Sequence, residues 1–162
     1  MPTNLYGPGD NYDPLNSHVL PSLISRFCKA KIEKEKEVFC WGTGSPSREF
    51  LHVDDLARAC LFALEKWDIN DQLTFSNSNG EKLSYLNVGT GKDISIYDLA
   101  YLIADIIGYK GSIRWDHSKP DGTPKKQLDT SRINSLGWHP KISLKKGLEE
   151  TISTYLKNIS SF

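Results

Sequence analysis

The histidine at position 18 is the residue of this sequence best suited to move protons. It follows the turn-rich segment GPGDNYDPLNS (7–17) and stands where an apolar helical pattern begins. Imidazole exchanges protons near neutral pH, so a histidine at the start of a helix can serve as a general acid or base. An ordinary exposed histidine in a first helical turn would give the same pattern, and the sequence alone leaves both interpretations open.

Four other side chains are of types suited to a phosphorylated ligand. Arg48 follows the turn GTGSPS (42–47), where a guanidinium can donate two parallel hydrogen bonds to phosphate oxygens, and Arg26 is a second cation. Trp41 ends an expected strand and offers an aromatic wall, while Asp121 in KPDG can accept hydrogen bonds from hydroxyl groups. Solvated arginines, a core tryptophan and a solvated turn are the alternatives.

The segment GTGKDI (89–94) has some features of a dinucleotide-binding fingerprint. It follows an expected strand and precedes an expected helix, but Ile94 stands where the motif requires its last glycine. We therefore predict that its glycines shape a loop. The sequence also lacks H-E-x-x-H, G-x-S-x-G and Walker motifs and any Cys/His ligand cluster, so we predict no metal site.

Strands and helices are expected to alternate along the chain, which indicates an α/β fold. Strands are predicted at 2–6, 37–41, 48–53, 83–88 and 112–116, and helices capped by Ser17, Asp54, Ser95 and Ser143, with a short one at 131–136. The first helix carries the apolar stripe Val19, Leu20, Leu23, Ile24 and Phe27. In the second, Leu56, Ala59, Cys60, Ala63 and Leu64 are expected to face inward. Gly108 and Gly137 should end helices, and 68–82 reads as a polar connection.

Composition excludes several classes of function. The chain has 162 residues, enough for one domain, and its 20 Lys and Arg balance its 20 Asp and Glu, so no strong net charge would attract nucleic acid or a membrane surface. No apolar run approaches the length of a membrane span, and no signal peptide is visible. The three cysteines, Cys28, Cys40 and Cys60, are expected to be reduced structural thiols. We expect a soluble cytoplasmic protein.

Four segments in order closely resemble one enzyme family. They are PTNLYGPGDNYDPLNSHVLPSLISRF, WGTGSPSREFLHVDDLARA, LNVGTG with KDISIYDLA, and KPDGTPKKQLDTSRINSLGW. They are similar to the GDP-L-fucose synthases, NADPH-dependent epimerase/reductases of the extended short-chain dehydrogenase group that act on GDP-4-keto-6-deoxy-D-mannose. The resemblance covers nearly the whole chain but only the C-terminal half of that family. It implies that residues 1–162 form a nucleotide-sugar binding domain with a remnant of the Rossmann sheet, and that the N-terminal NADP-binding part is missing.

The resemblance also implies roles for individual residues. His18 matches the family histidine that, with a cysteine, exchanges protons at C3 and C5 of the keto sugar. Pro2, Thr3, Asn4 and Leu5 match the segment along the nicotinamide end of NADP(H), which His18 also borders. Arg26, Trp41, Arg48 and Asp121 match positions that bind the GDP-sugar.

Other parts of the family pattern are absent. No tyrosine of this chain has a lysine four residues later, the glycine-rich fingerprint is missing, and no cysteine matches the catalytic one. We therefore expect no turnover by the chain alone. The family forms homodimers, largely through the missing half, so the resemblance leaves the oligomeric state of this chain open. Two alternatives remain: another nucleotide-sugar epimerase or dehydratase, and a non-catalytic nucleotide-sugar binding module that works with a partner chain.

Overall fold

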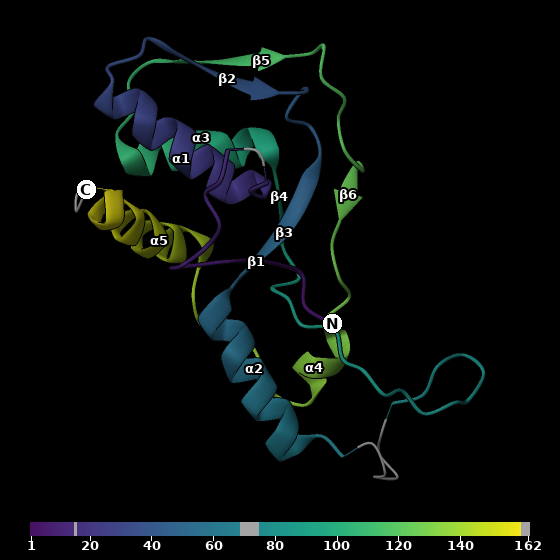
Figure 1. The fold of residues 1–162 in the computed structure, drawn as a ribbon. Coiled ribbons are helices and arrows are strands. Elements are labelled where there is room, and N and C mark those ends of the chain that lie inside the picture. Colours follow the sequence, from purple (N-terminus) through teal and green to yellow (C-terminus); the bar gives the residue numbers. More distant parts are fainter. Residues whose placement is uncertain (15, 69–74, 160–162) are drawn as a thin grey trace.

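The fold is mixed α/β, as predicted (Figure 1). A computed structural model describes residues 1–14, 16–68 and 75–159. The elements are β1 (Asn4–Tyr6), α1 (Val19–Ile32), β2 (Glu37–Trp41), β3 (Ser47–His52), α2 (Val53–Lys66), β4 (Asp93–Ser95), α3 (Ile96–Ile107), β5 (Ser112–Asp116), β6 (Lys125–Lys126), α4 (Ser131–Ser135) and α5 (Leu144–Ile159). None of the helices in these described ranges is long and apolar enough to cross a membrane.

Strand β3 is the central element of the larger sheet. Its last three residues pair in parallel with β1. Its first three pair with β4, and the first two of these also pair with β6. Strands β2 and β5 form a separate two-stranded parallel sheet. In Figure 1, β3 runs between this small sheet and α2, so it connects the two ends of the molecule.

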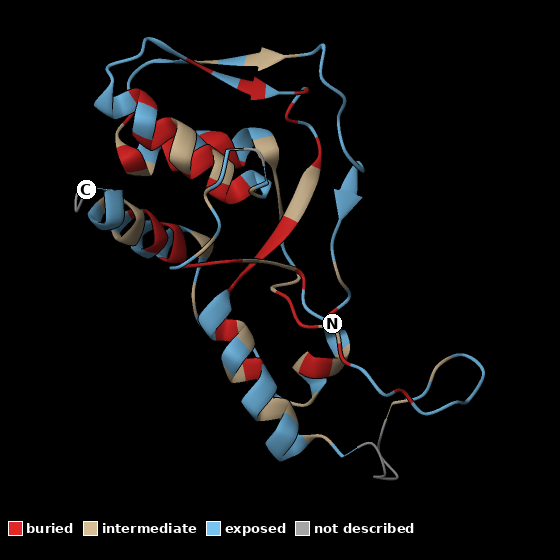
Figure 2. Ribbon diagram, in the orientation of Figure 1, coloured by how far each residue is buried: buried red, intermediate tan, exposed pale blue. Residues whose placement is uncertain are grey.

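The main core lies where α1, α3 and α5 pack on one another and on the inner face of β2 and β5. Leu20, Leu23, Ile24 and Phe27 of α1 are buried there, as the predicted stripe requires. Figure 2 shows buried segments on all three helices. Val19, at the start of the stripe, is instead 37% exposed. A second, smaller core packs α2 against α4 and the chain around Leu86 and Val88.

The helix ends match the predictions in part. Ser95 caps α3, because its hydroxyl accepts a hydrogen bond from Asp98 N at 2.9 Å, and Gly108 ends this helix in the left-handed region at φ 73°. Ser143 Oγ accepts from Lys146 N at 3.4 Å, directly before α5. These caps depend on local sequence alone, and local reasoning found them.

The predicted caps Ser17 and Asp54 are wrong. The N-cap of α1 is His18, one residue later. The N-cap of α2 is His52, whose Nδ1 accepts a hydrogen bond from Asp54 N at 3.3 Å. Because β3 runs directly into α2, the last residue of the strand takes the capping position, and its ring nitrogen replaces the usual carboxylate or hydroxyl.

Two other predictions fail for reasons of tertiary structure. Residues 83–88 form no strand, because among them only Val88 pairs, in an isolated parallel bridge with Pro2. Cys60 and Leu64 of α2 are exposed, Leu64 to 85%, because the described neighbours of α2 cover only the side around Asp55 and Ala59. The predicted polar connection 68–82 lies partly outside the described residues.

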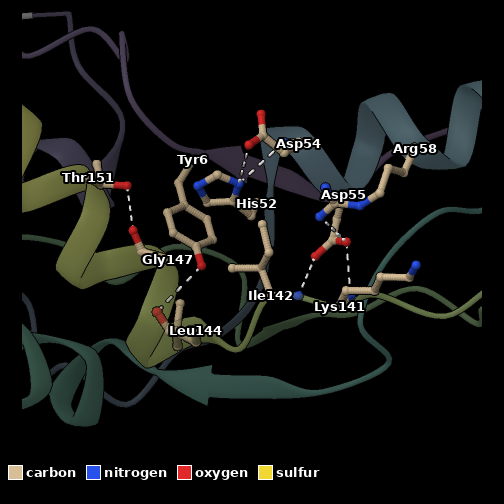
Figure 3. A network of polar contacts seen from close by, with 10 residues as sticks. All are labelled: Tyr6, His52, Asp54, Asp55, Arg58, Lys141, Ile142, Leu144, Gly147 and Thr151. Carbon is tan, nitrogen blue, oxygen red and sulfur yellow. Dashed lines mark hydrogen bonds and ion pairs between the residues drawn. The ribbon is translucent and has the colours of Figure 1, made fainter.

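A buried polar network joins β1, α2 and α5 (Figure 3). Asp55, fully buried, accepts hydrogen bonds from Lys141 N, Ile142 N and Arg58 Nη2, each at 2.9 Å. Burial alone would raise the pKa of Asp55, but these three bonds and the charge of Arg58 outweigh it and hold the pKa below its usual value. Tyr6 packs edge-on against the His52 ring at 5.3 Å. The network fixes β1, which forms one wall of the site described below.

Candidate functional site

Three adjoining hollows line the start of α1, and together we call them the α1 cleft. The first, of about 670 Å³, lies between β1, the start of α1 and β3. The second, of about 200 Å³, lies along the turn 42–46 and the loop 120–122. The third, of about 210 Å³, lies beside the part of α1 that carries Ser22, Leu23 and Arg26. Val19 lines all three hollows, Arg48 lines the first and second, and Trp41 lines the second and third. The three hollows therefore adjoin one another along the start of α1.

The structure brings the five predicted side chains of β2, β3, α1 and the KPDG loop onto this cleft. His18 lines the first hollow, Asp121 the second and Arg26 the third, while Arg48 and Trp41 lie at the junctions. These residues are far apart in the sequence, so their common placement is a property of the fold. Their roles toward a ligand stay predictions.

His18 is exposed at the N-terminus of α1. Its main-chain oxygen accepts a hydrogen bond from Ser22 N at 3.0 Å, and its ring makes no hydrogen bond that caps the helix. The backbone of His18 thus holds the helix start, while the imidazole is left for contact with a molecule in the first hollow. This placement suits a group that gives and takes protons.

The segment from Pro2 to Leu5 supplies another wall of the first hollow. Thr3, Asn4 and Leu5 line it together with His18, whereas Pro2 is not among the lining residues. The Asn4 side-chain amide donates a hydrogen bond to the main-chain oxygen of Glu49 at 2.8 Å, which fixes β1 against β3. The contact of Pro2, Thr3, Asn4 and Leu5 with a nicotinamide stays a prediction, and three of the four line the hollow that it requires.

Arg48 is held at the junction of the first and second hollows. Its Nη1 donates hydrogen bonds to the main-chain oxygens of Thr123 at 2.6 Å and Ser47 at 2.7 Å. Gly122 lies so close that a Cβ atom there would be 2.9 Å from Nη2. Within the described part of the chain, Nε and Nη2 make no hydrogen bond, so this edge of the guanidinium can bind an oxyanion with two parallel bonds.

Asp121 holds the turn that faces it. Its carboxylate accepts hydrogen bonds from Thr43 N at 2.9 Å and from Thr43 Oγ1 at 2.7 Å. The hydrogen bonds from Thr43 keep the pKa of Asp121 below its usual value, so the group is ionised at neutral pH. A carboxylate can accept more than two hydrogen bonds. The predicted contact of Asp121 with a ligand therefore stays a prediction, beside this observed structural role.

Trp41 is not the core residue that the alternative interpretation would require. It is 64% exposed, with the Arg26 guanidinium 5.4 Å and the Lys119 ammonium 5.6 Å from its ring. Arg26 is itself fixed by a hydrogen bond from Nη1 to the main-chain oxygen of Phe39 at 2.8 Å. A large exposed ring with two cations beside it is suited to stack on a planar group and to attract negative charge.

Two charged residues of the α1 cleft were missed by sequence reasoning. Lys126 lines the first hollow, because the parallel register of β3 and β6 pairs it with Arg48. Lys125, its neighbour, forms an ion pair with Asp93 at 3.3 Å instead. Asp10 also lines the first hollow. The paired lysines after KPDG were visible in the sequence, but only the strand pairing shows which of them reaches the cleft.

The cysteines do not supply a reactive thiolate to the cleft. Cys40 borders the third hollow, but it is buried, and burial raises its pKa to about 11. Burial likewise raises the pKa of Cys28 to about 11. Both thiols are therefore protonated at neutral pH. Cys60 lies exposed on α2 and does not line the α1 cleft.

Comparisons with known proteins show which proteins this chain resembles. A model of the NAD dependent epimerase/dehydratase family matches residues 1–75. GDP-L-fucose synthase 1 of Arabidopsis thaliana is 50% identical over 159 residues, which cover 98% of this chain and 45% of that protein. The GDP-L-fucose synthase of Escherichia coli K12 is 48% identical over 162 residues, 100% of this chain and 49% of that protein. The chain is thus similar to GDP-L-fucose synthases along its whole length, and its first 75 residues match the NAD dependent epimerase/dehydratase family.

A solved structure of a similar protein has the same fold. A gdp-l-fucose synthetase from Naegleria fowleri bound to NADP superposes with a TM-score of 0.81 at 28% sequence identity, covering 99% of this chain and 46% of that one. The resemblance to GDP-L-fucose synthases is thus confirmed. The chain spans about half the length of the curated relatives that it matches. Its assignment to the C-terminal half of the family stays a prediction.

Proposed function

We propose that this chain is the GDP-sugar binding part of an NADPH-dependent epimerase/reductase that converts GDP-4-keto-6-deoxy-D-mannose to GDP-L-fucose. The relatives named GDP-L-fucose synthase are about half identical to this chain along its whole length. The observation that carries the proposal is that adjoining hollows of the α1 cleft present Trp41, Arg48 and His18 in this order. A nucleoside, a diphosphate and a sugar follow one another in the same way along a nucleotide sugar.

Each part of the cleft suits one part of that ligand. Trp41, with Arg26 beside it, forms a platform for the nucleoside. The open edge of Arg48 and the ammonium of Lys126 suit the diphosphate, because both are cations on the same hollow. The sugar then lies beside His18 at the end of the cleft.

His18 would exchange a proton with the sugar ring. A ketone at C4 acidifies the protons at C3 and C5, so a base can remove one and an acid can return it on the other face. NADPH, when bound beside Thr3, Asn4 and Leu5, supplies hydride to C4. We place the chain in the C-terminal half of such an enzyme on the resemblance of its PTNL, NSHV and KPDG segments, and we expect a cytoplasmic protein.

The test is to titrate the purified chain with GDP, UDP and dTDP by calorimetry and to assay it with the keto sugar and NADPH. We expect GDP to bind at least tenfold more tightly than UDP or dTDP, and no oxidation of NADPH. Tighter binding of UDP or dTDP would favour another epimerase or dehydratase of the family. Lack of binding by any of the three would overturn the proposal, and turnover would overturn the expected inactivity.

The two lysines of β6 provide a matched pair of variants. Lys126→Ala is expected to weaken GDP binding about five- to tenfold, because a charge-assisted contact of about 1–1.5 kcal/mol is lost. Lys125→Ala removes the same charge from the neighbouring position, but its ammonium pairs with Asp93. We expect it to change the dissociation constant less than about twofold. Equal effects of both changes would show that only the net charge matters.

A further inference from the structure

Glu49 is a buried carboxylate next to Arg48 on β3. Its side chain is fully buried, and no lysine, arginine or histidine of the described ranges forms an ion pair with it. A buried charge without a counter-ion is costly unless several hydrogen bonds compensate for it. Hydrogen bonds within the structure must therefore compensate for the desolvation of the Glu49 carboxylate.

The hydrogen bonds come from two separate loops. Glu49 Oε1 accepts from Gly91 N at 2.8 Å and from the Thr90 hydroxyl at 3.4 Å, and Oε2 accepts from Leu128 N at 2.8 Å. Gly89 is packed so closely on the carboxylate that a Cβ atom there would collide with Oε1. The GTG segment, which has some features of a phosphate-binding loop, thus encloses an anion that belongs to the chain itself.

These bonds fix the elements that carry the cations of the α1 cleft. Leu128 lies two residues after Lys126, and the Gln127 side-chain amide also donates to Gly91 O at 2.5 Å. Strand β6 has only two residues, both exposed, and pairs with β3 at only Ser47 and Arg48. The carboxylate therefore anchors the chain immediately after β6, where the short strand pairing alone gives little support.

We propose that Glu49 is a positioning residue for diphosphate binding. It holds the loop at 89–91 and the chain after β6 against β3, and so it sets the spacing between the Lys126 ammonium and the Arg48 guanidinium. Glu49 does not touch the ligand and acts only through these two cations. This inference rests on the proposed nucleotide-sugar site.

The test compares GDP with GMP, because only the diphosphate needs both cations. In Glu49→Gln, an amide NH₂ replaces one acceptor oxygen and faces a backbone N–H. We expect this variant to bind GDP about tenfold more weakly than the unaltered chain while its affinity for GMP changes less than about twofold. Glu49→Asp, which keeps the charge, should recover part of the preference for GDP.

Glu37→Gln is the matched control, since Glu37 lies on β2 and pairs with Arg114 on the exposed face. It should leave both affinities unchanged. Equal weakening of GDP and GMP in Glu49→Gln, or an unchanged preference for GDP with only a lower melting temperature, would overturn the inference. If Glu49→Gln does not fold, Glu49→Asp decides on the same criterion. An unaltered chain that does not prefer GDP to GMP would instead overturn the proposed diphosphate site.

Discussion

Arg48→Ala is expected to bind GDP about 100-fold more weakly than the unaltered chain, the largest loss of any single change in the cleft. The reason is that Nε and Nη2 are the edge of the guanidinium that the described chain leaves open, and two charge-assisted hydrogen bonds to a diphosphate contribute about 1.5 kcal/mol each or slightly less. Calorimetric titration with GDP measures the effect. Arg48→Lys should recover less than a third of the lost free energy, because a lysine keeps the charge but cannot form the paired bonds.

Arg114→Ala is the control for this variant. Arg114 is also a strand arginine, but it pairs with Glu37 at 2.9 Å and does not line the α1 cleft. Its loss should leave the dissociation constant for GDP within about twofold. If Arg114→Ala and Arg48→Ala weakened GDP equally, Arg48 would act through net charge, and its assignment to the diphosphate would be wrong.

Asp55→Asn is expected to destabilise the fold by about 2–3 kcal/mol at pH 7. The three groups that donate to Asp55 come from α2 and from the segment before α5, and an amide in its place presents an NH₂ to one of these donors. Urea denaturation measures the free energy of unfolding. Asp54→Asn is the matched control, because its side chain is 59% exposed, and it should change the stability by less than about 0.5 kcal/mol.

The same variant has a predicted pH dependence. The pKa of Asp55 is lower in the folded state than its unfolded value of about 3.9. Its contribution is therefore complete above the unfolded pKa and is lost as the pH falls through the folded pKa. We expect the difference in stability between the unaltered chain and Asp55→Asn to narrow as the pH falls below about 4. A difference that stays constant down to about pH 2 would show that the carboxylate charge does not matter.

Features set by neighbouring residues were predictable from the sequence. The buried stripe of α1, the Ser95 cap and the glycine that ends α3 each depend on a few adjacent positions. The elements and residues that were predicted wrongly depend on distant parts of the chain. Residues 83–88 have the composition of a strand, but only Val88 among them finds a pairing partner, and Leu64 of α2 has no described neighbour to cover it.

The candidate site shows the same division. His18, Arg48 and Trp41 were found because motifs of a known family carry them. Lys126 was missed because its place depends on the register between β3 and a two-residue strand. Glu49 and Asp55 were missed because an acidic residue in a sequence is typical of a surface position, and only the folded chain shows the backbone donors around each.

An insertion or a deletion within the six residues of β3 would change which face of the strand each side chain points to. Successive residues of a strand point to opposite faces, so the loss of one residue between Ser47 and His52 would turn the guanidinium inward and the buried carboxylate toward the ligand. The backbone donors that now surround Glu49 would then face a cation, and the position of the Arg48 guanidinium in the cleft would be taken by a carboxylate. Homologous chains are free to differ in length in their loops, but this short segment should keep one length in all of them.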